Sequence, residues 1–164
     1  MSISNTGNKA EERFCKITAA TGLKKSDPRG DAFINIDEEP RYVEIKKVGN
    51  STANQVRPYK YLPLVIWHAQ SAEWYVMPPQ DIVDFAKSKS GQHALVSFVC
   101  CNFGKAQWKK EKYRADKSQL RNKVLKAIAD GDGARTHKLL MEMVKPDAEK
   151  LQEKYSKILE EGLL

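Results

Sequence analysis

Glu44 and Lys46 stand two positions apart in the segment RYVEIKKV, residues 41–48. Apolar and charged residues alternate there, which predicts a β-strand whose Glu44 and Lys46 side chains leave the same face. A solvent-exposed ion pair contributes only about 0–1 kcal/mol, so stability gives little reason for this pair. Because Val43 and Ile45 flank the two charges, we interpret Glu44 and Lys46 as candidate catalytic residues rather than as a solvated rim.

Asp31 is predicted to join the same face from the preceding strand. Residues 31–36, DAFINI, have a strand-like composition and are followed by the turn sequence DEEP at 37–40. If the turn consists of its first two residues, Asp31 lies directly opposite Glu44. If it consists of all four, Asp31 lies opposite Lys46. Both registers keep the three charged side chains on one face, whereas a slip by one residue would separate them.

Two carboxylates and an ammonium group on one face match the needs of a hard divalent cation. Mg²⁺ binds through a few oxygen ligands and keeps several waters, which suits a phosphate substrate. Asp31 and Glu44 supply the carboxylates, and the backbone carbonyl of Ile45 supplies a third oxygen. Lys46 carries a compact positive charge that can assist an attacking water. We therefore expect a Mg²⁺ site here, with Mn²⁺ as a substitute.

Glu11 lies on a helix that is predicted to begin after Asn8, its N-cap, and to end at Thr21. The spacing of Asn8 and Glu11 fits a capping box, so Glu11 is interpreted first as a capping residue. A metal-ligand or water-positioning role for Glu11 is the alternative, and the sequence leaves open whether Glu12 joins the site.

The dipeptide GD at 30–31, followed by VEIKK at 43–47, resembles the D…(D/E)xK signature of the PD-(D/E)XK nuclease superfamily. The resemblance covers about residues 8–100 and is closest to small type II restriction endonucleases. It implies an α/β fold of the α+β kind, with a restriction-endonuclease-like αβββαβ core and a mixed central sheet. It also implies Mg²⁺-dependent cleavage of double-stranded DNA, by an enzyme that acts as a homodimer on symmetric sites.

The chain departs from the superfamily pattern in two places. The PD dipeptide is reversed, as Asp27-Pro28, and the metal role is therefore assigned to Asp31. The first core strand would have to fit within the short segment GLKKS, residues 22–26.

The stretch after the motif strand, residues 49–67, begins with a polar segment and resembles the same region of small restriction endonucleases. Gln55 and Tyr59 also match the QxxxY spacing of RecB-like nucleases. Gln55 is therefore a candidate catalytic residue, and a loop hydrogen-bond donor is the alternative. Arg57 and Lys60 are candidate phosphate contacts, with plain surface charge as the alternative.

The chain carries a net charge of +7, from 28 Lys and Arg against 21 Asp and Glu. This excess permits a polyanionic partner. It is concentrated in residues 105–121, where Trp108 and Tyr113 are interleaved with basic residues, and the alternative there is a solvated helix face. The candidate DNA contacts of this segment are Lys109, Lys110, Lys112 and Arg114.

The remaining patterns divide the chain into a nuclease core at 1–104 and a helical C-terminal extension at 105–164. Within the core they predict a hairpin at 64–77, a helix at 78–89 and a strand buried on both faces at 94–101. The extension is expected to contain amphipathic helices for DNA binding and for packing or dimerisation, and no strand.

Several classes are disfavoured. The three cysteines lack the CxxC spacing of a zinc site, and the three histidines are scattered. No apolar run approaches the roughly 20 residues that span a bilayer, and the N-terminus lacks a signal pattern, so we expect a cytoplasmic protein without a membrane partner. Two alternatives to a restriction enzyme remain: a structure-selective nuclease of the junction-resolvase or repair type, and a non-catalytic nucleic-acid-binding module.

Overall fold

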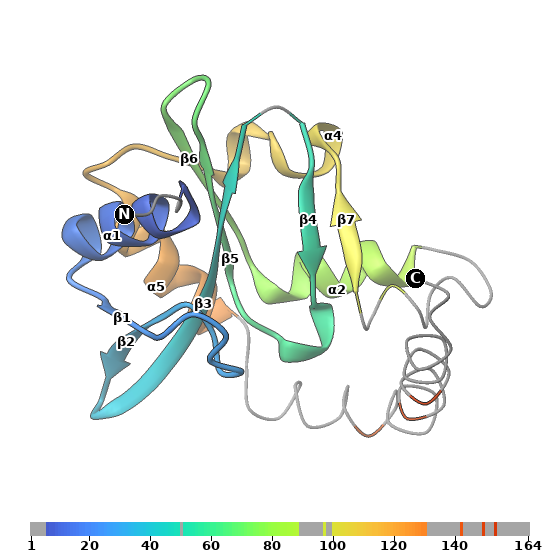
Figure 1. Cartoon of the computed structure of the whole chain (residues 1–164), viewed down its shortest axis with the longest axis horizontal. Coiled ribbons are helices and arrows are strands. Elements are labelled where there is room, and N and C mark those ends of the chain that lie inside the picture. The colour runs from blue at the N-terminus through green and yellow to red at the C-terminus, as the bar shows by residue number, and fades with distance from the viewer. Residues whose placement is uncertain are drawn as a thin grey trace.

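The computed structural model describes residues 6–49, 51–88, 97 and 100–130, and the single residues 142, 149 and 153. Its fold is mixed α/β: helices and a small two-stranded sheet, β4-β7, accompany a six-stranded sheet of order β1-β2-β3-β5-β6-β8 (Figure 1). The strands are β1 (Thr21–Gly22), β2 (Ala32–Ile36), β3 (Glu39–Val48), β4 (Ala53–Val56), β5 (Leu64–His68), β6 (Glu73–Met77), β7 (Cys101–Phe103) and β8 (Arg114–Ala115). The helices are α1 (Thr6–Thr18), α2 (Pro79–Lys87), α4 (Lys105–Trp108) and α5 (Leu120–Asp130), with 3-10 turns η1 (Pro58–Lys60) and η2 (Glu111–Tyr113).

β2 and β3 form an antiparallel hairpin through a two-residue turn at 37–38. Both turn residues have positive φ angles, 52° and 66°, as a type I′ hairpin turn requires. Ala32 consequently pairs with Val43, which is the register predicted for the shorter turn. Asp31 directly precedes Ala32, and Glu44 directly follows Val43, so Asp31 stands at the end of the hairpin opposite Glu44.

β3 continues into the main sheet as the parallel neighbour of β5, with Glu44 paired with Leu64. Parallel neighbours require a crossover connection. Here the crossover includes β4 and η1, and Pro58 is the first residue of η1. β5 and β6 then form the predicted hairpin, and α2 forms at the predicted helix.

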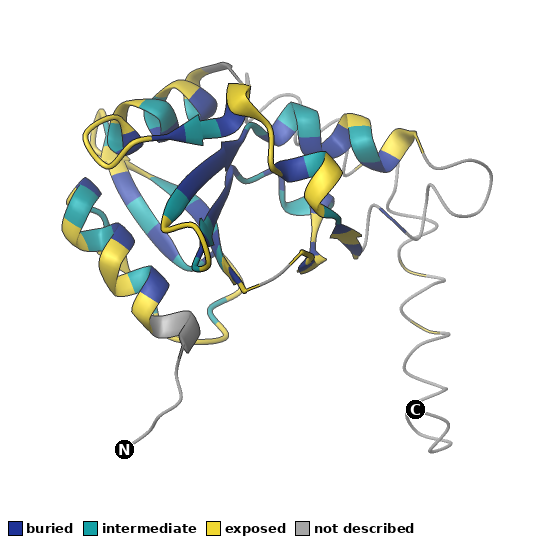
Figure 2. Ribbon diagram, turned by 90° about the horizontal axis from the view of Figure 1, so that it is seen from above, coloured by how far each residue is buried: buried dark blue, intermediate teal, exposed yellow. Residues whose placement is uncertain are grey.

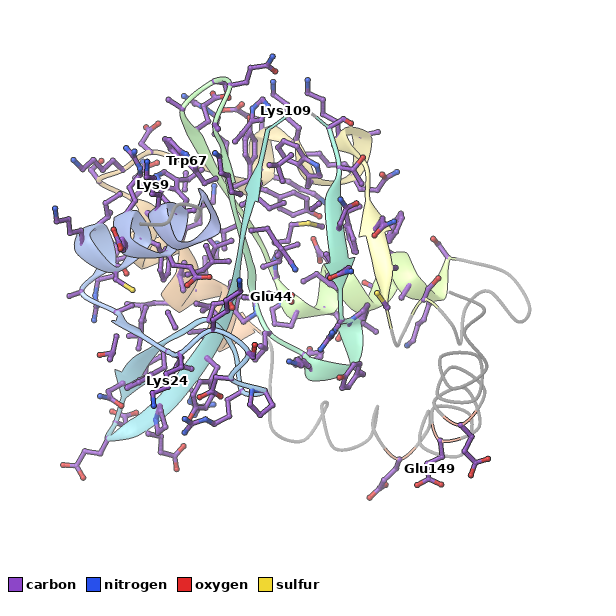
Figure 3. All side chains as sticks on the ribbon, in the orientation of Figure 1. Lys9, Lys24, Glu44, Trp67, Lys109 and Glu149 are labelled. Atoms are coloured by element: carbon purple, nitrogen blue, oxygen red, sulfur yellow. The ribbon has the colours of Figure 1, made fainter. Side chains whose placement is uncertain are left out.

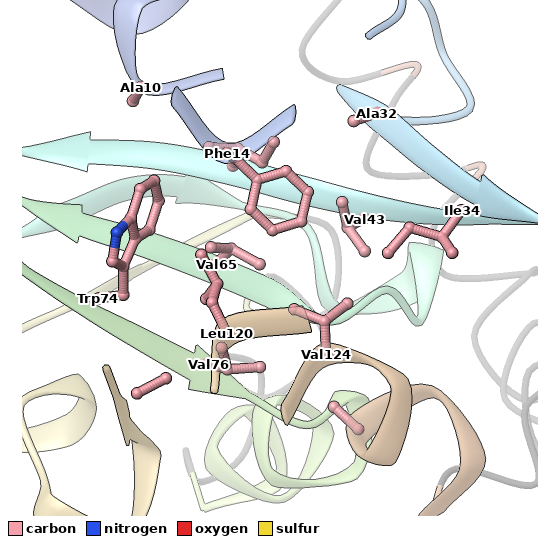
Figure 4. Close-up of a cluster of buried hydrophobic side chains, with 13 residues drawn as sticks. Ala10, Phe14, Ala32, Ile34, Val43, Val65, Trp74, Val76, Leu120 and Val124 are labelled. Atoms are coloured by element: carbon pink, nitrogen blue, oxygen red, sulfur yellow. The ribbon is translucent and has the colours of Figure 1, made fainter. Parts of the chain in front are cut away.

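Helices α1 and α5 cover one face of the main sheet, where they enclose an apolar cluster (Figure 4). Phe14 of α1 is fully buried, and its ring lies 6.2 Å from that of Trp74 on β6. Burying a side chain of this size contributes about 1.5–3 kcal/mol, so Phe14 holds α1 on the sheet. Leu120 and Val124 of α5 complete the cluster.

A second apolar cluster occupies the opposite face, under α2, α4 and the small sheet. β3 contributes to both clusters, because Val43 and Ile45 belong to the first and Val48 to the second. Figure 2 shows buried and partly buried residues running through the central strands. By alternation, Glu44 and Lys46 share the face of Val48, so the sheet holds both charges close to its interior.

α1 ends earlier than predicted. Its last residue is Thr18, whose hydroxyl donates to the carbonyl of Phe14 at 2.8 Å, and Ala19 then adopts a positive φ of 61°. The chain continues into β1, so Thr21 lies on a strand rather than in the helix. The short first strand is therefore present, but it overlaps the expected segment only at Gly22.

The expected strand at 94–101 is wrong in its extent. β7 begins only at Cys101 and pairs with β4, outside the main sheet. Ser97 is helical, and most of the segment lies outside the described residues. A short apolar run has no periodicity that separates a buried strand from a buried helical segment, which is the reason for the error.

β8 is a strand where none was expected. Arg114 and Ala115 pair with β6 and form the edge of the main sheet. α5 is one of the amphipathic helices expected in the extension, and Arg121 donates a hydrogen bond to the carbonyl of Thr18 on α1. Residues 105–130 thus share the sheet and the core of the preceding chain, whereas the rest of the extension, apart from three single residues, lies outside the described ranges. None of the helices that the structure describes is long and apolar enough to cross a membrane.

Candidate active site

Gly30 and Asp31 bring the chain against β3 at the point where Glu44 leaves it. A Cβ atom at position 30 would lie 3.0 Å from the carbonyl oxygen of Val43, and the φ angle there is 157°, so a side chain would be strained. The Asp31 amide donates to that carbonyl at 3.0 Å. The Asp31 carboxylate in turn accepts a hydrogen bond from the amide of Ile45 at 2.7 Å. Asp31 is therefore fixed to β3 through both its backbone and its side chain.

The backbone of Ile45 faces Asp31. The Glu44 amide donates to the carbonyl of Pro63 at 3.0 Å, so Glu44 bonds toward β5 and Ile45 bonds toward the other side. Because the N–H and C=O of one strand residue point to the same side, the Ile45 carbonyl is directed toward the Asp31 side of β3. The Ile45 carbonyl oxygen must point this way if it is to bind a metal ion together with the Asp31 carboxylate.

Glu44 and Lys46 form a partly buried ion pair. Lys46 Nζ lies 3.3 Å from Glu44 Oε1, and the two side chains are 26% and 15% exposed. Burial raises the pKa of Glu44; Lys46 opposes the rise and Asp31 adds to it. Figure 3 shows Glu44 on β3 near the middle of the molecule. The pair is therefore not a solvated rim, because desolvation of the carboxylate outweighs its attraction to the ammonium group.

Glu11 interacts with the same charges from α1. The helix includes Asn8, so the capping-box interpretation of Asn8 and Glu11 does not hold. Burial, and then the charge of Asp31, raise the pKa of Glu11 to about 7, while Lys25 and Lys46 oppose the rise. The structure thus brings Glu11, the alternative candidate for a metal ligand, into electrostatic range of Asp31 and Lys46.

Glu12 takes a different direction. It is exposed on another flank of α1, where it lines a cavity together with Arg13 and Trp67. Glu12 therefore does not join the carboxylates.

Asp31, Glu44 and Glu11 have the oxygen chemistry of a hard-cation site. As their side chains stand, no three Asp, Glu, His or Cys groups within the described ranges converge closely enough to coordinate one ion. Mg²⁺ does not need three, because it commonly binds through one or two carboxylates and retains waters. Desolvation and repulsion raise the pKa of both Glu11 and Glu44, and a divalent cation would offset both effects. The residues present therefore fit Mg²⁺ chemically.

Arg57 and Lys60 line a hollow of about 440 Å³ that also includes Tyr42 and Arg29. Tyr42 precedes Glu44 by two residues on β3, so the hollow continues along the same face. The Lys60 ammonium opposes the rise in the pKa of Glu44. Both predicted phosphate contacts thus lie at a hollow that adjoins the carboxylates.

Gln55 lies on β4, in the second sheet. Its φ angle is 57°, and its backbone amide donates to Oδ1 of Asn102 at 3.0 Å. In the part of the chain that the structure describes, the Gln55 side chain shares no hydrogen bond with Asp31, Glu44 or Lys46. The structure therefore does not bring this predicted catalytic residue into the carboxylate cluster.

The four basic residues predicted to contact DNA differ in their surroundings. Lys109 and Lys110 are exposed. Lys112 Nζ lies 3.9 Å from a carboxylate oxygen of Asp81. The guanidinium of Arg114 forms ion pairs at 2.8–3.5 Å with three carboxylates, those of Glu73, Glu111 and Asp116. Lys109 and Lys110 are thus the two of these four that have no ion pair within the described residues.

The aromatic residues of this basic segment belong to the core. Trp108 is fully buried, and its ring lies 5.2 Å from that of Tyr75. Tyr113 is buried, and its hydroxyl donates to Asp81 at 2.6 Å. Neither ring is placed to stack on a base.

Sequence reasoning missed Arg29. Asp27 accepts hydrogen bonds from the backbone amide of Arg29 at 2.9 Å and from its guanidinium at 2.8 and 3.0 Å, and these bonds lower the pKa of Asp27 to about 2. The guanidinium lies 5.5 Å from the ring centre of Tyr42. The signal was the Asp-Pro-Arg sequence itself, because an Asp commonly bonds to the backbone two residues further on.

Comparison with known proteins adds no family assignment to this geometry. A scan of the chain against protein-family models found no match, and a search of curated protein sequences found no similar protein.

Proposed function

We propose that this protein is a Mg²⁺-dependent endodeoxyribonuclease of the PD-(D/E)XK kind, most similar to a sequence-specific type II restriction enzyme. One observation carries the proposal: Asp31 stands opposite Glu44 and binds the amide of Ile45, while Lys46 pairs with Glu44 on a partly buried face. These residue types, in this spatial order, match the D…(D/E)xK signature to which the sequence is similar, and they suit cleavage of a phosphodiester with Mg²⁺. A purely structural role would not require three partly desolvated charges at one point of a sheet.

The proposed roles follow from the positions of the side chains. Asp31 and Glu44, with the Ile45 carbonyl, would hold Mg²⁺, and Mn²⁺ would substitute. When bound, the ion supplies charge stabilisation at the phosphoryl oxygens. The Lys46 ammonium would orient the attacking water and stabilise charge that develops on the phosphate. Glu11 would lie beside these groups on α1, where a bound cation would offset the burial and the repulsion by Asp31 that raise the pKa of its carboxyl group.

The hollow beside the carboxylates supplies a place for the flanking backbone. Arg57 and Lys60 would contact the phosphates next to the scissile one, because the hollow continues along the face of β3. The αβββαβ core, double-stranded DNA as substrate and a homodimer on symmetric sites are part of the same proposal. Lys109 and Lys110, both exposed, would add backbone contacts.

Incubation with large natural duplex DNA, with Mg²⁺ and with EDTA, tests the proposal. Discrete bands that require Mg²⁺ support a sequence-specific enzyme. A smear would indicate a nonspecific nuclease, and cleavage confined to branched substrates would indicate a junction-resolving enzyme. Binding without cleavage would overturn the catalytic proposal and favour a binding module. Asp31→Asn, purified in parallel, shows whether any cleavage belongs to this chain rather than to a contaminant.

A further inference from the structure

A cavity of about 750 Å³ lies on the flank of α1 that faces away from Glu11. The hairpin of β5 and β6 and the edge strand β8 form its other walls. Figure 3 shows Lys9 of α1 and Trp67 of β5 close together on this side of the molecule. Glu11 is two positions, or about 200°, around the helix from Lys9, so the cavity is separate from the carboxylates.

Basic side chains dominate the wall that α1 contributes. Lys9, Arg13 and Lys16 follow one another at helical spacing and form a single row along the cavity. Lys117, which follows β8, also lines it. All four are exposed, and within the described residues none of the four forms an ion pair with a carboxylate.

The acidic groups of the cavity are largely neutralised. Glu73 and Asp116 both pair with Arg114, at 2.8 and 3.5 Å. Glu12 is the remaining carboxylate that lines the cavity. The row of cations is therefore left with an excess of positive charge.

An aromatic surface lies beneath the cations. Trp67 is half-buried, whereas Trp74 and Trp108 are buried. The Arg13 guanidinium lies 5.0 Å from the ring centre of Trp67. The buried ring of Trp74 packs against the Trp67 ring, with the two ring centres 4.8 Å apart. The contact with Trp67 holds Arg13 over the indole, so the cavity wall carries a cationic group packed on an aromatic ring.

We infer that this cavity binds a single-stranded segment of nucleic acid. The row Lys9, Arg13 and Lys16 contacts successive phosphates, and a base stacks at Trp67 and Arg13. Cations that follow a backbone, combined with an aromatic platform, are the features by which single strands are bound without reading their sequence. A duplex hides the faces of its bases and gains nothing from an indole inside a cavity. This site goes beyond the proposed nuclease function and depends on neither Mg²⁺ nor cleavage.

Fluorescence anisotropy with a labelled 20-nucleotide oligo-dT, in EDTA and over a range of salt concentrations, tests the inference. Lys9→Ala/Lys16→Ala should weaken binding at least about fivefold and reduce the slope of log K against log salt by about 1.4, since each single-strand phosphate contact contributes about 0.7. The matched control, Lys87→Ala/Lys126→Ala, removes two exposed lysines that do not line the cavity and should bind within about twofold of the unaltered protein. Oligo-U in place of oligo-dT distinguishes RNA from DNA.

Tryptophan fluorescence gives an independent reading. Binding should quench the emission of Trp67, the half-buried indole, and Trp67→Phe should lose this quenching while retaining most of the affinity. No binding of either oligonucleotide would overturn the inference, as would equal weakening in the two double variants. A 20-base-pair duplex that binds more tightly than the strand and is weakened by Lys9→Ala/Lys16→Ala would overturn it too, because the cavity wall would then be a duplex contact.

Discussion

The two flanks of α1 carry opposite charges in opposite surroundings. On one flank, Glu11 is partly desolvated and interacts with Asp31. On the other, Lys9, Arg13 and Lys16 are exposed along a cavity. Desolvation makes a charge costly, so a buried carboxylate indicates a site where chemistry or a cation offsets that cost. Exposed cations cost little and contribute affinity for an anion without sequence or reaction specificity.

Two adjacent lysines of β3 also differ in their surroundings. Lys46 is partly buried and pairs with Glu44, whereas Lys47 is exposed on the opposite face. The difference shows that net charge alone says little about function, since the surroundings of each charge decide whether it acts on a reaction or on binding.

The largest expected effect concerns the carboxylates. Asp31→Asn and Glu44→Gln should each reduce Mg²⁺-dependent cleavage of plasmid DNA to the level seen in EDTA, because the cation loses a charged ligand. Asn at position 31 keeps an oxygen that can accept the Ile45 amide, so its melting temperature should remain near that of the unaltered protein. Binding of oligo-dT in EDTA should not change in either variant. Normal turnover in both would remove the site assignment.

The second prediction compares adjacent lysines. Lys46→Ala should slow cleavage at least about 100-fold, on the scale of removing one donor that stabilises a transition state, with little change in duplex affinity. Lys47→Ala removes the same charge from the opposite face and should cleave at nearly the normal rate. Single-turnover rates at saturating enzyme measure both. Equal losses would mean that the two faces of β3 are not functionally distinct.

The third prediction concerns pH. The pKa of Glu11 is about 7 in the folded protein against an ordinary 4.5, so the folded state holds a proton that the unfolded state releases between these values. Stability should therefore fall as pH rises from about 4.5 to about 7 and then level off, and the raised pKa of Glu44 acts in the same direction. Because Glu11 is only partly buried, solvent screening reduces the effect, and we expect a change of about 1–2 kcal/mol.

Urea unfolding at pH 5 and pH 8 in EDTA measures this change. Glu11→Gln should reduce the difference between the two pH values. Mg²⁺ at pH 8 should stabilise the unaltered protein but not Asp31→Asn. A protein that becomes more stable from pH 5 to pH 8 would contradict the sign of the argument.

The smallest expected effect concerns the exposed pair after α4. If Lys109 and Lys110 contact a duplex, replacing both with Ala should reduce the slope of log K against log salt by about 1.8, since each duplex contact contributes about 0.9. Lys87→Ala/Lys126→Ala again serves as the control. An unchanged slope would return Lys109 and Lys110 to a solvated surface.

Local periodicity determined much of this protein. Alternation along residues 41–48 predicted the strand, its two faces and the shared face of Glu44 and Lys46, and both possible hairpin registers kept Asp31 on that face. The hairpin of β5 and β6, α2 and α5 followed from similar patterns. These elements depend on the steric and solvation preferences of residues that are neighbours in the sequence, so the sequence alone is enough to predict them.

Only the tertiary structure decided which charges remain free and which meet. It selected the shorter turn, placed Asp31 on the amide of Ile45 and brought Glu11 into electrostatic range of Asp31 and Lys46. It also paired Arg114 with Glu73, a carboxylate 41 residues earlier in the chain. Gln55 and Arg114 look equally suited to function in the sequence. Their surroundings come from packing between segments far apart in the chain, which no local pattern encodes.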